Sequence, residues 1–132
     1  MKDITNEWLK AAKDDLDTIE ELITEEHLTN IVAFHAQQCV EKSIKAIMEE
    51  YEIPFSKIHS LETLIEKLID KIDFDIDNQI VLKLDKLYLD SRYPGDTGLL
   101  PDGKPNIEEA KSFLDFAKTF YSNIRKLLKA EY

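Results

Sequence analysis

The glycines and prolines of this chain are concentrated in one stretch, residues 87–105, and this constrains the fold more than any other feature. All three glycines and three of the four prolines of the 132-residue sequence lie there. Because these two residue types are the least favourable in helix interiors, the rest of the chain is free to form long helices. An irregular segment of this length is usually functional or disordered. Its start contains Tyr88, Arg92 and Tyr93, which stack, donate hydrogen bonds and bind anions, so function is favoured over a disordered linker.

Outside this stretch, apolar residues recur at three- and four-residue steps, which is the helical period. The spacing predicts helices at about 5–24, 29–52, 60–72 and 77–90, and a long one after 106. No segment has the alternating pattern of a strand. The predicted fold class is therefore all-α. We expect an antiparallel up-and-down helical bundle of four main helices plus a shorter fifth, with an irregular loop at about 91–105.

Local signals place the helix ends and the polar faces. Thr29 or Asn30 is expected to cap the second helix, Ser60 the third, and Asn106 the last, with Glu109 as its capping-box partner. The first helix carries five acidic residues between its apolar positions, and these are most simply a solvated face: Asp14, Asp15, Asp17, Glu20 and Glu21.

Composition excludes several classes of function. The formal net charge is −10, which argues against extensive electrostatic binding to the phosphate backbone of an extended nucleic acid. Residues 101–132 nevertheless carry six basic and five acidic side chains, so a local basic patch stays open. The apolar runs are too short to span a membrane, and the first residues have no apolar signal region, so we expect a cytoplasmic protein. The single cysteine, Cys39, cannot form an internal disulfide and is expected to be a small buried group.

A line of polar residues on the second helix is the strongest candidate site. The apolar stripe of this helix is predicted to be Ala33, Ala36, Val40, Ile44, Ile47 and Tyr51. The opposite face then holds His35, Gln38, Cys39, Lys42 and Lys45. A histidine, a glutamine and lysines in a row can hold a phosphate, while Arg92 adds a bidentate fork and Tyr88 or Tyr93 a stacking surface for a base.

The same residues also have a purely structural interpretation, which is favoured for each of them taken singly. The polar groups of the second helix then form a solvated face or a buried network. Arg92 pairs with Glu41 or another carboxylate and fixes the loop to the bundle, while Tyr93 fills a groove. His59 is expected to have a loop or capping role. The sequence contains no HExxH, CxxC, GxSxG or P-loop motif, so we expect no metal, no cofactor and no catalytic residue of the usual kinds.

Three motifs together resemble the HEPN family (higher eukaryotes and prokaryotes nucleotide-binding). The segment Ala33–Ala46, AFHAQQCVEKSIKA, is similar to the second helix of these domains. His59-x-Leu61 and Tyr88-x-x-Ser91-Arg92-Tyr93-Pro94-Gly95 follow in the family's order and approximate spacing. The resemblance runs from the first helix to the last. It implies one HEPN-like helical domain over residues 1–132.

The resemblance also implies partners. Relatives commonly form homodimers, and in many prokaryotes they occur beside a minimal nucleotidyltransferase as a toxin–antitoxin or abortive-infection pair. Many members are metal-independent ribonucleases with an Arg-x(4–6)-His motif. Here Thr97, Gly98 and Leu99 stand where that histidine is sought, and no histidine follows Arg125. We therefore expect a module that binds a nucleotide, a nucleotidyltransferase or both. The alternatives are a ribonuclease that uses His35 and Arg92, and a purely structural dimerisation domain.

Overall fold

The computed structural model describes residues 1–92 and 103–131. Its helices are α1 (Asp3–Leu22), α2 (Thr29–Glu50), α3 (Leu61–Lys67), α4 (Asn78–Arg92) and α5 (Ile107–Glu131), and a 3₁₀ turn, η1 (Glu26–Leu28), precedes α2. The described residues contain no strand. The predicted all-α bundle of four main helices and a shorter fifth, α3, is therefore confirmed.

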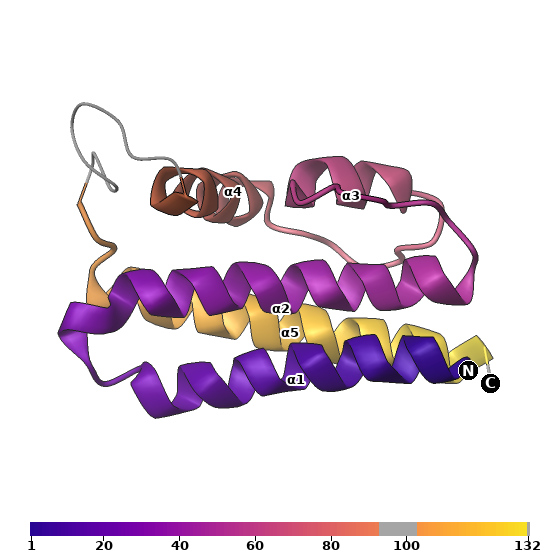
Figure 1. Ribbon diagram of the computed structural model, residues 1–132, viewed down its shortest axis with the longest axis horizontal. Helices are drawn as coiled ribbons and strands as arrows, with labels where there is room; N and C mark the ends of the chain where they lie inside the picture. The colour runs from indigo at the N-terminus through magenta and orange to yellow at the C-terminus, as the bar shows by residue number, and fades with distance from the viewer. Residues whose placement is uncertain (93–102, 132) are drawn as a thin grey trace.

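The helices are arranged in layers around α2 (Figure 1). Helices α1, α2 and α5 lie side by side along the long axis, with α1 antiparallel to the other two. Helices α3 and α4 cover α2 from the other side. Helix α2 contacts every other helix, so most of its circumference is buried.

This central position corrects one prediction. Lys45, placed by periodicity on the polar face of α2, is buried, with 7% of its surface exposed, whereas the expected burial of Cys39 is confirmed at 0%. The predicted apolar stripe is buried too, from Ala33 to Ile47, and Tyr51 is half-buried. Because helices cover α2 from two sides, side chains at its polar positions are buried together with its apolar side chains.

The ends of the helices test the predicted caps. The Ser60 hydroxyl accepts a hydrogen bond from the backbone N–H of Thr63 at 3.3 Å, so that cap is confirmed. Asn106 and Glu109 form the predicted capping box: the Glu109 N–H donates to Asn106 Oδ1 at 2.8 Å, and the Asn106 N–H donates to Glu109 Oε1 at 3.3 Å.

Three predicted boundaries are wrong. The third helix was expected to reach about residue 72, but α3 ends at Lys67. Neither Thr29 nor Asn30 caps α2, because η1 leads directly into the helix and Thr29 is already its first residue. The irregular loop was expected from about 91, but Ser91 and Arg92 form the last turn of α4. Residues 93–102 of the predicted loop lie outside the described residues. Across the part of the chain that the structure covers, no helix is both long enough and apolar enough to traverse a bilayer.

Candidate functional site

Asp15 of α1 joins two of the predicted site residues on α2. Its Oδ1 lies 2.8 Å from Nδ1 of His35, and its Oδ2 lies 2.9 Å from Nζ of Lys42. The Lys42 contact is an ion pair by distance without hydrogen-bond geometry, since Oδ2 accepts no hydrogen bond from the described residues. His35 and Lys42 are seven residues apart, two turns along one helix face, so one carboxylate on α1 reaches both. Asp15 is 6% exposed, so the prediction that it belongs to a solvated face is wrong.

Glu41 of α2 organises a second cluster beside the first. Its Oε2 lies 2.9 Å from Nζ of Lys45 and 3.4 Å from Nδ1 of His59. Its Oε1 accepts a hydrogen bond from Nε2 of Gln37 at 3.1 Å. The same Gln37 amide donates to the carbonyl oxygen of His59 at 3.0 Å, so the segment before α3 is fastened to α2. Glu41 is 4% exposed, and each of its oxygens has a partner, as burial of a carboxylate requires.

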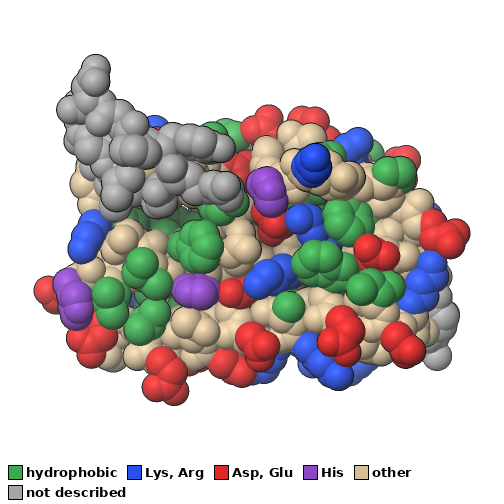
Figure 2. Space-filling view, viewed as in Figure 1, with side chains coloured by type: hydrophobic (Ala, Val, Ile, Leu, Met, Phe, Trp, Pro, Cys, Tyr) green, Lys and Arg blue, Asp and Glu red, His purple; other side chains and the backbone are tan. Residues whose placement is uncertain are grey.

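Aromatic rings lie next to both clusters. The Tyr88 ring of α4 stacks on Phe34 of α2, with 6.0 Å between ring centroids and 20° between the planes. His59 lies 6.1 Å from the same Tyr88 ring, and His35 lies edge-on to Phe34 at 5.3 Å. Figure 2 shows the surface this produces over α1 and α2, where histidine, lysine and acidic side chains alternate with apolar ones. We call this surface the α2 edge: Asp15, Phe34, His35, Gln38, Glu41, Lys42, Lys45, His59 and Tyr88.

The structure places the predicted residues as follows. His35 and Lys42 share Asp15, while Lys45 pairs with Glu41 and lies 5.6 Å from the centroids of both Trp8 and Phe55. Gln38 donates to the Gln37 side chain at 2.7 Å, and Tyr88 is 7% exposed.

The side chains of two predicted site residues are not among those described. Arg92 is the last residue of α4, but its side chain lies outside the described part of the structure, as does Tyr93.

Sequence reasoning missed the residues that hold the α2 edge together. Asp15 lies among other acids of α1, and nothing local distinguishes it from Asp14 or Asp17. Glu41 was named only as one candidate partner for Arg92, although its spacing of four residues from Lys45 is that of a helical ion pair. Its described partners are Lys45, His59 and Gln37.

The arrangement fixes what the α2 edge can do chemically. In both His35 and His59, Nδ1 contacts a carboxylate oxygen. Nε2 of neither ring has a hydrogen-bond partner among the described residues. Side-chain exposure is 25% at His35 and 50% at His59, so a ligand can reach both rings. A ring oriented in this way can donate or accept a proton at Nε2. Within residues 1–92 and 103–131, no group of three histidine, cysteine or acidic side chains is placed to hold a metal ion.

Comparison with known proteins agrees with this fold. The family model of the HEPN domain matches residues 5–127. The chain belongs to the HEPN family. A crystal structure of an archaeal HEPN homologue superposes on this HEPN domain with a TM-score of 0.68, covering 96% of this chain and 98% of that one. The two sequences are 23% identical, so the likeness shows the fold alone. No curated protein matches the sequence.

Proposed function

We propose that this HEPN domain is a binding module that engages a nucleotide, a minimal nucleotidyltransferase partner, or both, through the α2 edge. The supporting observation is the pair of buried carboxylates, Asp15 and Glu41, which hold two lysines and two imidazoles beside an aromatic stack. In this proposal the protein acts as a homodimer and as one half of a prokaryotic toxin–antitoxin or abortive-infection pair.

The charges of the α2 edge favour recognition by stacking and hydrogen bonding over attraction by a charge excess. Lys42 is offset by Asp15 and Lys45 by Glu41, so an approaching phosphate meets ammonium groups that are already paired. These groups are held in place, however, and little conformational entropy is lost when they bind. The exposed part of Phe34 beside Tyr88 offers a surface on which a base can stack.

Titration with nucleotides tests the nucleotide part of the proposal. ATP, GTP or mononucleotides are expected to raise the melting temperature of the wild type, as measured by thermal shift. The shift should be smaller in Lys42→Ala and Arg92→Ala than in the wild type. Lys111→Ala is the matched control, because Lys111 is exposed and lies on α5, which contributes no residue to the α2 edge. No shift in the wild type, or equal shifts in all four proteins, would contradict the nucleotide site.

Copurification tests the partner. A minimal nucleotidyltransferase encoded beside this gene should copurify with the wild-type chain, and light scattering should give the mass of a dimer. If both proteins are folded and do not associate, the partner proposal fails. A dimer that responds to neither nucleotides nor the transferase would instead support a purely structural dimerisation domain.

A ribonuclease is the second candidate, and one observation favours it. The 2.8 Å contact between His35 Nδ1 and Asp15 orients the imidazole as a general acid or base requires. In this alternative His35 moves the proton and Arg92 stabilises the negative charge that develops on the nonbridging phosphoryl oxygens. Cleavage of RNA in the presence of EDTA, abolished by His35→Ala and retained by Lys111→Ala, would establish it. No cleavage by the wild-type protein would remove it.

A further inference from the structure

A concave surface lies between α1 and α5, on residues that the α2 edge does not use. Its volume is about 470 Å³, and it is lined by Met1, which precedes α1, and by residues of both helices: Asn6, Leu9, Lys10, Lys13, Asp14, Tyr121, Arg125 and Lys129. Leu9 and Tyr121 are buried, while the charged side chains are exposed. We call this surface the α1–α5 groove. Its volume is in the range of small-molecule sites.

The charge of the groove is opposite to that of the protein. Four of its side chains are basic, Lys10, Lys13, Arg125 and Lys129, whereas Asp14 is the one acidic side chain among its lining residues. The whole chain carries a net charge of −10. Like charges drawn together in a concave surface repel one another and concentrate the positive potential there. A bound anion relieves this repulsion.

The two cations from α5 are available to a ligand. Lys10 lies 3.4 Å from Glu7, and Lys13 pairs with Asp17, so the cations of α1 are partly offset by acids of their own helix. Arg125 and Lys129 have no carboxylate partner among the described residues.

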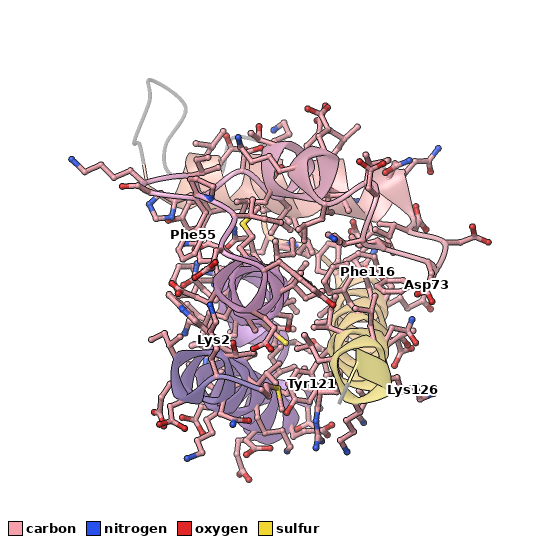
Figure 3. The ribbon with its side chains drawn as sticks, turned by 90° about the vertical axis from the view of Figure 1, so that its right-hand side faces the viewer. Lys2, Phe55, Asp73, Phe116, Tyr121 and Lys126 are labelled. Carbon is pink, nitrogen blue, oxygen red and sulfur yellow. The ribbon has the colours of Figure 1, made fainter. Side chains whose placement is uncertain are left out.

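The guanidinium of Arg125 is also held in place. It lies over the Tyr121 ring, 5.8 Å from the centroid, and this contact leaves its N–H groups free to donate. Figure 3 shows Tyr121 projecting from α5 toward α1.

We propose that the α1–α5 groove binds a phosphate-bearing small anion of up to mononucleotide size. Arg125 supplies a bidentate fork, Lys129, Lys10 and Lys13 supply point charges, and the Asn6 side chain supplies a hydrogen bond. A small anion suits the groove better than an apolar peptide does, because four of the nine lining residues are basic and Leu9 and Tyr121 are buried.

Calorimetric titration with two probes tests the proposal. One probe carries phosphate groups alone, and the other is a mononucleotide. Inorganic tripolyphosphate and AMP are added separately, at low ionic strength, to the full-length protein. Arg125→Gln should weaken binding of both about tenfold, as expected for one lost charge-assisted hydrogen-bonding group. Lys126→Gln is the matched control: it removes the same charge from the same helix, and Figure 3 shows Lys126 on the side of α5 away from Tyr121. It should change binding less than about twofold. Equal weakening by both variants, or no binding of either probe to the wild type, would overturn the proposal.

Nuclear magnetic resonance separates this groove from the α2 edge. Shifts of backbone amide signals on adding tripolyphosphate should map to residues 6–14 and 121–129, and Lys42→Ala should leave them unchanged. Shifts confined to residues 35–45 would overturn the groove and leave the function proposed for the α2 edge intact. The unliganded melting temperature of Arg125→Gln should equal that of Lys126→Gln, whereas a selective drop for Arg125→Gln would assign Arg125 a structural role and contradict the proposal.

Discussion

Asp15 is a buried carboxylate whose two oxygens face a histidine and a lysine of the next helix. Burial of a charge is unfavourable unless partners replace the lost water, so the three side chains stabilise the fold only as a set. Glu41 does the same for Lys45, Gln37 and His59. The α2 edge is therefore a structural element as well as a candidate site, and its carboxylates should be more sensitive to substitution than exposed acidic side chains of α1 such as Asp14.

Asp15→Asn tests this directly. The amide keeps the shape of the side chain but leaves Lys42 without its counter-ion and His35 without a charged partner. Because both partners are partly solvated, we expect a loss of about 1–3 kcal/mol in the free energy of unfolding, measured by urea denaturation at pH 7. Asp14→Asn is the control, since Asp14 is the exposed neighbour and should change stability by less than about 0.5 kcal/mol. Equal effects of the two substitutions would contradict the buried role of Asp15.

Cys39 gives a second prediction for a single residue. Burial, together with the negative charge of Asp15, raises the pKa of its thiol from 9.0 to about 12. Since the thiolate is the reactive form, the native protein should not be labelled by Ellman's reagent over minutes at pH 8. The same protein in guanidinium chloride should release one equivalent of thionitrobenzoate, which controls for oxidation. Rapid stoichiometric labelling of the native protein would show that α2 opens or that the thiol is accessible.

At the scale of the helix, the start of α5 contributes a pH-dependent part of stability. Glu109 accepts hydrogen bonds from the Lys83 ammonium of α4 and from the backbone N–H of Asn106, and the Lys83 contact is the larger cause of a pKa below the ordinary 4.5. A carboxyl group with a lowered pKa in the folded state stabilises the fold above its unfolded pKa. That contribution is lost as the pH falls through the folded pKa.

Glu109→Gln isolates this contribution, because glutamine keeps the capping-box hydrogen bond and removes only the charge. At pH 7 the variant should be less stable by about 0.5 kcal/mol, as for a partly exposed ion pair near a helix N-terminus. The difference should shrink as the pH is lowered below 4.5, measured by urea denaturation at several pH values. Glu108→Gln, in the same helical turn but without the Lys83 contact, reports the effect of the helix dipole alone. A difference that stays constant from pH 7 to pH 3 would show that Glu109 acts without its charge.

The helices also show how much of this protein can be predicted from its sequence. The caps at Ser60 and Asn106 were predictable because both partners lie within three residues of each other. The contact between Asp15 and His35 was not, because it joins residues twenty positions apart on two helices, and the period of α1 marks Asp15 only as polar. Lys45 was misplaced for a related reason: periodicity describes one buried face, whereas α2 is covered from both sides.

At the scale of the whole molecule, α2 and α5 approach each other closely, and small residues permit this. Ala36 and Ala117 are fully buried, and Sγ of Cys39 lies 3.9 Å from the carbonyl oxygen of Ala117. A larger side chain at Ala117 would push α5 away from α2. This matters for both surfaces, because the α2 edge depends on the packing of α2 and the α1–α5 groove on the position of α5.

Ala117→Leu should therefore destabilise the entire bundle. Three added carbon atoms have no space at this contact, and we expect a loss of about 3 kcal/mol in the free energy of unfolding, from strained rotamers and displaced backbone, measured by urea denaturation. Ala11→Leu is the control, because Ala11 is half-buried on α1 and should change stability by less than about 1 kcal/mol. If Ala117→Leu is as stable as Ala11→Leu, the interface between α2 and α5 must have room that the fully buried Ala117 does not indicate. The close approach of the two helices would then not be what positions α5 beside α1.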